Sequence, residues 1–546
     1  MAIIPMPAFA EQQPGQFTLP AQVVVTYDDE ELANTADLLI KQLCSRLNLT
    51  AEAQPCAQPN HQSTTGPATI VLGLHPEGLA SLEDLSNLDE AYDLTITPEG
   101  ISIAAIHAHG VFNGVQSLLQ LLPATPAGDS VTLDCLKIID SPRFGWRGGM
   151  LDVGRHFFAL PFIFKFLDLL AFYKFNIFHW HLTEDQGWRM EVKSHPKLTE
   201  MGAWRRTGET ESYGGFYTQA EMKEVVAYAA ERFIEVVPEV ELPGHCGAAL
   251  ACYPHLSCSG EVAEVPRQWG VHEDVYCAGK EETFQFLETV LNETMAMFPC
   301  QYIHIGGDEC PKVRWQSCPC CQKRIQDLGL EDEYELQSWF VSRINKFLKA
   351  AGKKLIGWDE ILEGGLAEGA TVMSWRGITG GVRAARAGHP VIMTPTSHCY
   401  FDYRQSLRAD EPGAWYAMLP LEVVYSFDPV PPEPVDCATP MSHSSMDSSA
   451  SDLNLNLNAA STGSLAGDWA LEASHSDNIL GGQANVWTEY ISDQATVEYM
   501  TLPRLAAMAE ALWSPKDMRD WEDFQARLRV HLRHYDAMGL TYRPLG

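Results

Sequence analysis

From about residue 144 onward, short apolar segments alternate with longer segments in which apolar residues recur at the period of an α-helix. Eight of the short segments are typical of buried strands: residues 146–153, 176–182, 233–242, 302–309, 354–360, 371–377, 390–395 and 479–487. Helical patterns lie between most of them, at residues 160–173, 218–233, 281–298 and 332–352. Strands that alternate with helices favour a parallel sheet, and eight such units predict a closed (β/α)8 barrel.

The chain before residue 140 has a different pattern. Residues 17–27 and 91–106 alternate in the manner of strands, and residues 111–123 form an amphipathic helical pattern that ends at Pro123. These features predict a smaller α+β domain over residues 16–140, preceded by a tail over residues 1–15 and followed by the barrel over residues 141–546. Residues 437–478 are rich in Ser and Asn without useful periodicity, which predicts a flexible insertion between the last two strands.

The carboxyl ends of the eight segments are rich in Asp, Glu, His and Trp. In a (β/α)8 barrel the active site lies at these ends. The strongest local signal is HIGGDE, residues 304–309. Adjacent side chains of a regular strand point to opposite faces, but two glycines permit a bulge, so that Asp308 and Glu309 could both reach one pocket. The alternative is an acidic barrel rim with one carboxylate in solvent.

The motifs at the strand ends resemble those of glycoside hydrolase family 20, the β-N-acetylhexosaminidases. They are RGGMLDVGRHF, FHWHLTEDQGWR, PEVELPGH, HIGGDE, GWDE, SWRG and GGQANVWTEY, in this order from Arg147 to Tyr490. The resemblance implies an exo-acting, retaining enzyme that releases terminal, non-reducing β-linked N-acetylglucosamine or N-acetylgalactosamine. In this family the substrate's own acetamido group attacks C1, which gives an oxazolinium intermediate, and no metal or other cofactor is required.

The resemblance also implies catalytic roles. Glu309 would be the general acid and then the base, and Asp308 would orient the acetamido group. Tyr400 would donate a hydrogen bond to the acetamido carbonyl, and Asp185 with His245 would support the general acid. An ionised neighbour disfavours ionisation of a carboxyl group, so we expect Asp308 to help Glu309 keep a proton near neutral pH.

Six further residues would bind the sugar if the resemblance holds. They are Trp358, Trp375 and Trp487 as aromatic walls, and Arg155, Asp402 and Glu489 as partners of hydroxyl groups. The structural alternatives are core packing for the tryptophans and for Tyr400, and a surface ion pair for Arg155. Two positions depart from the family pattern while preserving charge: Glu184 stands where the family has a first aspartate, and Glu241 replaces the aspartate that follows PE[IV].

Two groups of residues raise the question of a metal. His179, His181 and His245 lie at strand ends and have a feasible ligand geometry, but the HWHLTEDQ motif fits the family without a metal. Cys310, Cys318, Cys320 and Cys321 are close together in the sequence, and we expect a structural disulfide or free thiols there in preference to zinc. Cys258 and Cys277 flank one loop and could form a disulfide in an oxidising compartment.

Charge and hydropathy limit the partners. The formal net charge is −33, from 71 acidic and 38 basic residues, which disfavours nucleic acid and anionic membranes. No apolar stretch is long enough to span a bilayer. Ala8-Phe9-Ala10 has the form of a signal-peptidase site, but no basic segment or adequate apolar segment precedes it, so either the start is truncated or the resemblance is chance. This slightly favours a periplasmic or secreted location over the cytoplasm. The expected partner is an oligosaccharide that ends in N-acetylhexosamine, and no pattern indicates an oligomeric state.

Three alternatives remain at this point. A conventional two-carboxylate retaining β-glycosidase on the same barrel would not depend on an acetamido group. A disaccharide-releasing enzyme, similar to a lacto-N-biosidase, would differ only in the loops at the rim. A carbohydrate-binding protein with an inactive barrel would be expected to lack Glu309 or Tyr400, and both are present.

Overall fold

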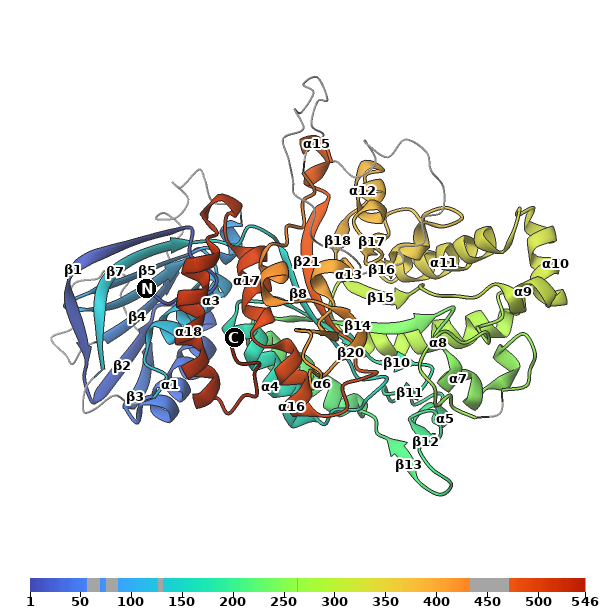
Figure 1. Cartoon of the computed structure of the whole chain (residues 1–546), viewed down its shortest axis with the longest axis horizontal. Helices are drawn as coiled ribbons and strands as arrows, with labels where there is room; N and C mark the ends of the chain where they lie inside the picture. The colour runs from blue at the N-terminus through green and yellow to red at the C-terminus, as the bar shows by residue number, and fades with distance from the viewer. Residues whose placement is uncertain (56–68, 75–86, 126–130, 263, 433–470, 546) are drawn as a thin grey trace.

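The computed structural model has two parts, a mixed sheet domain and a closed barrel, with the C-terminal helices between them (Figure 1). It describes residues 1–55, 69–74, 87–125, 131–262, 264–432 and 471–545. None of the helices in this part of the chain combines the length and the apolar character that a bilayer span requires.

All eight predicted barrel strands are confirmed. They are β8 (Trp146–Asp152), β9 (Ile177–His181), β14 (Glu235–Leu242), β15 (Tyr302–Gly306), β16 (Lys354–Trp358), β17 (Thr371–Ser374), β18 (Val391–Met393) and β21 (Ile479–Val486). Each strand pairs in parallel with its neighbours, and β21 closes the barrel by pairing with β8. Side chains of Trp146, Val237, Ile356 and Met373 are among those that fill the interior, so the barrel is a packed core with its site at one end.

The helices that cover the barrel include α4 (Leu160–Phe172), α6 (Gln219–Ala230), α8 (Glu281–Met297), α11 (Glu333–Ala350) and α12 (Thr379–Arg386). The first four coincide with the predicted helical patterns. At the start of α6, the Thr218 hydroxyl accepts a hydrogen bond from the Glu221 amide, and the Glu221 carboxylate accepts one from the Thr218 amide. This capping box satisfies two backbone donors that the helix itself cannot pair.

The N-terminal domain is a seven-stranded sheet in the order β1-β7-β5-β6-β4-β2-β3. Its strands are β1 (Phe9–Leu19), β2 (Gln22–Tyr27), β3 (Thr50–Pro55), β4 (Thr69–Leu74), β5 (Tyr92–Thr97), β6 (Gly100–Ala105) and β7 (Val131–Asp140). Two helices, α1 (Ala33–Leu47) and α3 (Ala108–Leu121), pack their apolar residues against the sheet. The predicted α+β domain is therefore present, and it precedes the barrel.

The expected tail over residues 1–15 needs correction, because this segment is part of the fold. Strand β1 pairs antiparallel with β7, and Ile3 and Ile4 are fully buried. The Ile4 amide donates to Gln120 Oε1 at 2.9 Å. Most of β1 is exposed and polar, since it is an edge strand, and it therefore lacks the alternation that reveals a half-buried strand. Of the expected insertion, residues 437–470 lie outside the described residues, while 471–478 include the short helix α15 (Ala473–Ser476) before β21.

A buried polar joint connects the two parts. At the end of β7, Asp140 accepts hydrogen bonds from Tyr92 Oη at 2.7 Å and from Trp513 Nε1 at 2.9 Å. Lys174, which follows α4, places its Nζ 3.4 Å from the same carboxylate. Trp513 ends α17 (Arg504–Trp513), so Asp140 ties the sheet domain to two separate segments of the barrel.

Candidate active site

The backbone at the end of β15 turns sharply. Gly306, Gly307 and Glu309 have φ angles of 66°, 89° and 41°, in the left-handed region. A Cβ atom at Gly306 would lie 1.7 Å from Glu241 Oε2, so only glycine fits there. Because of this turn, the Asp308 and Glu309 carboxylates lie 3.6 and 3.4 Å from the same atom, Nε2 of His245. The two glycines thus allow the Asp308 and Glu309 side chains to approach the same point, as the sequence predicted.

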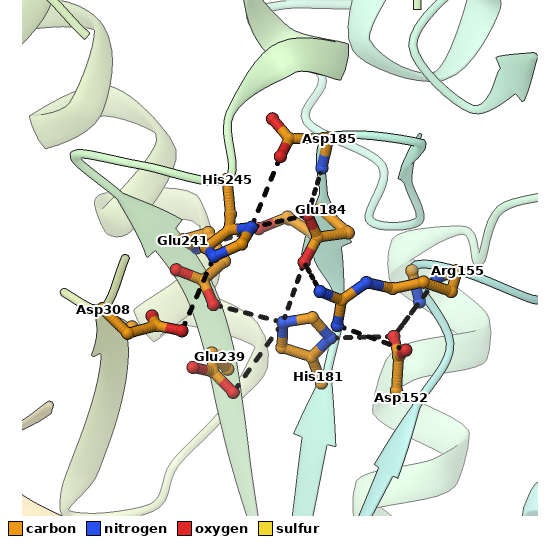
Figure 2. Close-up of polar contacts among 12 residues, drawn as sticks. Asp152, Arg155, His181, Glu184, Asp185, Glu239, Glu241, His245 and Asp308 are labelled. Atoms are coloured by element: carbon orange, nitrogen blue, oxygen red, sulfur yellow. Dashed lines mark hydrogen bonds and ion pairs between the residues drawn. The ribbon is translucent and has the colours of Figure 1, made fainter. Parts of the chain in front are cut away.

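The imidazole of His245 lies on the loop after β14, with Glu184 and Asp185 on one side and Asp308 on the other (Figure 2). Its Nδ1 is 2.9 Å from Glu184 Oε1 and 3.3 Å from Asp185 Oδ2. Burial lowers the pKa of His245, but the Glu184 and Asp308 carboxylates outweigh this and raise it well above its usual value. The ring is therefore an imidazolium whose Nδ1–H donates to Glu184 Oε1, while its Nε2 faces the carboxylates of Asp308 and Glu309.

The two carboxyl groups at the end of β15 have opposite pKa shifts. Burial, reinforced by Glu239 and Glu309, raises the pKa of Asp308 to about 7, although His245 opposes the shift. The hydrogen bond from His245 lowers the pKa of Glu309, whose side chain is 40% exposed. In the sugar-free structure these shifts favour a shared proton on Asp308 over one on Glu309. This is opposite to the expectation for Glu309, because burial differs between the two groups more than the sequence indicated.

Asp185 and Glu184 share the support of His245. The expected contact with Asp185 is present, and Asp185 Oδ1 also accepts the Gly247 amide at 2.7 Å, which fixes the backbone beside His245. The closer partner of the ring is Glu184, which the sequence reasoning noted only as a departure from the family pattern. Glu184 also binds Arg155, with 3.0 Å between Oε2 and Nη2, and so links two parts of the site.

Arg155 lies among acids and beside an aromatic ring. Its guanidinium nitrogens are 3.4 Å from Asp152 Oδ2 and 3.6 Å from Glu489 Oε1, and its Cζ lies 5.0 Å from the ring centre of Trp487. Burial lowers the pKa of Arg155, but the surrounding carboxylates, Glu184 first, raise it well above its usual value. Arg155 does not form the surface ion pair that was the structural alternative, because its side chain is only 10% exposed.

Aromatic rings form one wall of the site. Trp375 stacks on Tyr400, with 6.1 Å between ring centres, and Trp487 lies 6.2 Å from Tyr400. Burial raises the pKa of Tyr400 well above its usual value, so its hydroxyl keeps its proton. Trp358 differs: it is 1% exposed, packs 5.7 Å from Trp487, and donates its indole N–H to Glu239 in the barrel interior. It therefore lies beneath the wall and supports it.

Asp402 lies deep in the site on the loop after α13 (Thr396–Cys399). It is 4% exposed, and burial together with the charge of Glu489 raises its pKa well above the usual range. Among the described residues, Asp402 Oδ1 and Asp308 Oδ1 are buried oxygens without a hydrogen-bond partner. Buried acceptors are almost always paired in native proteins, so both oxygens are suited to a ligand that brings N–H or O–H groups.

Sequence reasoning missed a layer of charged residues below the site. His181 bonds through Nδ1 to Asp152 Oδ1 at 2.9 Å and through Nε2 to Glu241 Oε1 at 3.2 Å (Figure 2). Glu239 lies 2.8 Å from His304 Nδ1 and 2.9 Å from His179 Nε2. The HWH motif contains His179 and His181, and PEVE contains Glu239 and Glu241, but a strand pattern does not say that these polar side chains point inward.

Glu360 was also missed, although the GWDE motif contains it. Its Oε2 accepts the indole N–H of Trp375 at 2.9 Å and so fixes part of the aromatic wall. Burial, with contributions from Asp308 and Asp359, raises its pKa to about 8.

Several of these groups could hold a cation by distance alone. Four sets in the site have ligand atoms within 4.8 Å of one another: His179 with Glu239 and His304, His181 with Glu239 and Glu241, His245 with Glu184 and Asp185, and His245 with Asp308 and Glu309. Each set is already linked by short contacts between histidine and carboxylate, which explain the clustering without a metal. The expectation of a metal-free reaction stays a prediction.

A parallel barrel with adjacent carboxyl groups, an arginine among acids and an aromatic wall at its carboxyl end is typical of a glycoside hydrolase. The comparisons with known proteins agree. Residues 144–516 match the model of glycosyl hydrolase family 20, catalytic domain, and residues 1–141 match that of domain 2 of the same family. The chain belongs to glycosyl hydrolase family 20, among the β-N-acetylhexosaminidases.

Individual relatives cover nearly the whole chain. A β-hexosaminidase of Porphyromonas gingivalis is 41% identical over 99% of this chain, which spans 64% of the length of that protein. A β-N-acetylhexosaminidase of Cellulomonas fimi is 30% identical, with 99% of this chain and 96% of the relative covered. The structure of an exo β-N-acetylglucosaminidase from Vibrio harveyi in complex with N-acetylglucosamine superposes with a TM-score of 0.83 at 32% identity, over 100% of this chain and 78% of that one.

Proposed function

We propose that this chain removes terminal, non-reducing β-linked N-acetylglucosamine or N-acetylgalactosamine from oligosaccharides, with retention at C1 and with the substrate's acetamido group as the nucleophile. The observation that carries the proposal is the convergence of Asp308 and Glu309 on His245 beside the aromatic wall. The Vibrio harveyi enzyme, which binds N-acetylglucosamine, supports the choice of sugar.

In the first step, the acetamido carbonyl oxygen attacks C1 while the glycosidic oxygen leaves. Glu309 donates its proton to the leaving oxygen, and the ring of the new oxazolinium carries a positive charge. Asp308 accepts the acetamido N–H and stabilises this charge, and the Tyr400 hydroxyl donates to the acetamido oxygen. The buried, unpaired Oδ1 of Asp308 is suited to this task, because an N–H donor would satisfy it.

In the second step, water attacks C1 from the side that the leaving group vacated, and Glu309 takes its proton. The C1–oxygen bond of the oxazolinium breaks, and the acetamido group is restored. Two inversions give net retention. The protein supplies no covalent nucleophile, which is the exception that this family makes to the two-carboxylate mechanism.

Sugar binding also explains how the proton reaches Glu309. The sugar covers this half-exposed carboxyl group, and desolvation raises its pKa. The acetamido N–H at the same time favours the ionised form of Asp308. Binding therefore moves the shared proton from Asp308 to the general acid, and the two groups titrate as one coupled pair.

Arg155, Asp402 and Glu489 bind the hydroxyl groups of the same sugar. Charged hydrogen bonds to hydroxyls are directional, so they fix the ring as well as hold it. The apolar face of the sugar packs against Trp487, and the acetamido methyl group packs against the aromatic wall that Trp375 and Tyr400 form.

The test compares hydrolysis of an aryl β-N-acetylglucosaminide with that of the matching aryl β-glucoside. We expect a rate at least a hundredfold higher for the acetamido sugar, which corresponds to about 2.7 kcal/mol of activation free energy. Similar rates on the two substrates would overturn the proposal and favour a conventional two-carboxylate glycosidase. Release of a disaccharide from longer glycans, without activity on the monosaccharide substrate, would also contradict it.

A further inference from the structure

Four cysteines from three separate segments meet on the flank of the barrel. Cys258 follows the short helix η3 (Pro254–Leu256), Cys277 precedes α8, and Cys318 and Cys321 lie at the start of α10 (Pro319–Leu328). Their four Sγ atoms all lie within 4.8 Å of one another. Cys277, Cys318 and Cys321 are buried and Cys258 is half-buried. These residues are called the four-cysteine cluster below.

The distances within the four-cysteine cluster match a metal site. Sγ of Cys277 lies 3.8 Å from that of Cys318 and 3.6 Å from that of Cys321, and Cys258 and Cys321 are 3.8 Å apart. Four sulfurs at about 2.3 Å from a tetrahedral zinc ion are about 3.8 Å from one another. A disulfide would require about 2.05 Å. We propose that the four-cysteine cluster binds one Zn²⁺ ion in a closed, structural site.

The backbone around the four-cysteine cluster holds its three segments in place. The Cys277 amide donates to the Leu256 carbonyl at 2.8 Å, and the Trp315 indole donates to the Tyr276 carbonyl at 2.9 Å. At Gly279 a Cβ atom would lie 2.2 Å from the carbonyl carbon of Cys320, so the loop before α8 touches the start of α10 closely. Ligands that the protein has already positioned lose little freedom when a metal binds.

Two of the four ligands lie at the start of helix α10. Cys318 is its N-cap residue and Cys321 lies in its first turn. These two residues form a C-x2-C pair, the spacing that recurs in zinc sites.

Sequence reasoning considered a different set of four cysteines, because those are adjacent in the chain. Cys320 is exposed, and Cys310 packs beside Gly244, so neither belongs to the four-cysteine cluster. Cys258 and Cys277 take their places. Because four cysteine ligands now lie together, zinc replaces the disulfide or free thiols that the sequence favoured as the proposal for this site. None of the cysteines that the structure describes forms a disulfide.

The position of the four-cysteine cluster suggests what the ion stabilises. The Tyr276 amide donates to the carbonyl of Pro243 at 3.0 Å, two residues before His245. Helix α9 (Val313–Ser317) begins four residues after Glu309 and leads directly into α10. A zinc ion would therefore cross-link the loops that follow β14 and β15, which carry the general acid and its histidine.

The test is metal analysis of the full chain, purified without chelators from zinc-supplemented cells. Plasma mass spectrometry is expected to find about one zinc per chain in the wild type and in Cys320→Ser, the matched control at an exposed neighbour. Cys318→Ser is expected to lose the zinc. Because Cys318→Ser could fail to fold, the wild type is also loaded with Co²⁺, which should give the thiolate-to-cobalt charge-transfer absorption and the visible bands of a tetrahedral site.

Thiol titration in denaturant with EDTA distinguishes the alternatives. All 14 cysteines should react if the four-cysteine cluster binds zinc. Ten reactive thiols without zinc, the 14 less four in two disulfides, would overturn the proposal. So would 14 thiols with neither zinc nor a cobalt spectrum, or zinc that Cys318→Ser retains in folded form. EDTA is expected to lower the Tm of the wild type and of Cys320→Ser equally.

Discussion

Nε2 of His245 lies 3.4 Å from Oε2 of Glu309, so the imidazolium contacts the proposed general acid directly. A positive charge at this distance keeps Glu309 ionised in the empty site. The acid must therefore gain its proton when the sugar binds. The predictions below follow from this coupling between His245, Asp308 and Glu309.

The substitution Glu309→Gln removes the proton donor while keeping the shape of the side chain. We expect kcat to fall by about 10²–10⁴-fold on substrates with poor leaving groups, the range that general acid catalysis contributes. The loss should be much smaller for an activated aryl leaving group, which needs no proton. A leaving-group series on the wild type and the variant measures this, and equal losses across the series would remove the acid role.

The pH profile of kcat/KM should report the coupled pair. The singly protonated pair is the active form of the free enzyme, and its last proton is lost near pH 7 because burial raises the pKa of Asp308 to about 7. The wild type should therefore lose kcat/KM as the pH rises through this region. In Asp308→Asn only Glu309 titrates, with a lowered pKa, so the alkaline limb should move to lower pH and the rate on acetamido substrates should fall sharply.

The substitution His245→Gln should move the alkaline limb of the kcat/KM profile to higher pH, opposite to the shift expected for Asp308→Asn. Loss of the imidazolium removes the charge that lowers the pKa of both Asp308 and Glu309. The last proton is then retained to higher pH, and the alkaline limb of kcat/KM should shift upward. Parallel profiles of the wild type and the two variants test the pair of shifts, and a common direction for both variants would contradict the coupling.

Asp308 should also limit stability. Its folded pKa is raised to about 7 from an ordinary value of 3.8, so the folded protein binds this proton more tightly than the unfolded chain does. The resulting stability is present below about pH 4 and is lost as the pH rises through about 7. The variant Asp308→Asn has no proton to lose at this position, so its stability should not fall in this pH range. The difference in Tm, variant minus wild type, should therefore be larger at pH 8 than at pH 5. A difference in Tm that does not change with pH would refute the assignment.

Gly306 and Gly329 form a matched pair for the turn after β15. Both have φ near 66°, but a Cβ at Gly306 meets Glu241 Oε2 at 1.7 Å, whereas nothing lies within 4 Å at Gly329. Gly329→Ala should cost about 1–2 kcal/mol of unfolding free energy, from the left-handed backbone alone, with normal activity. Gly306→Ala should cost more and abolish most activity, because the clash displaces Asp308. Denaturant titration and kcat/KM separate the two effects, and similar behaviour of the two variants would count against the steric argument.

Much of the fold could be predicted because the barrel strands are buried on both faces. Segments such as 146–153 and 302–309 are short apolar runs between helical patterns, and such runs can be recognised in a single sequence. Strand β1 is different, since its exposed polar residues at the sheet edge resemble a tail. A hydrophobic pattern reveals only strands that bury side chains. An edge strand such as β1 is held mainly by backbone hydrogen bonds, which leave no such pattern.

The candidate site was predictable where residues are neighbours in the chain. Asp308 and Glu309 could be placed together because two glycines precede them. The burial of Glu239 between His179 and His304 had no such signal, because these three residues lie on different strands and only the closed barrel brings them together. For the same reason the sequence groups Cys318 and Cys321 with their chain neighbours, whereas the fold brings them to Cys258 and Cys277.

The joint at Asp140 makes the two parts of this protein depend on each other when they fold. If the barrel were produced without residues 1–141, Lys174 and Trp513 would lose the Asp140 carboxylate, and the apolar surface that packs on the sheet domain would be exposed to water. Apolar surface that loses its burial gives up about 25 cal/mol per Å² of stabilisation, and a large exposed apolar patch promotes aggregation. The intact chain should therefore melt in one calorimetric transition, and the barrel alone should be recovered as aggregate. The sheet domain is then best regarded as a folding partner of the catalytic barrel.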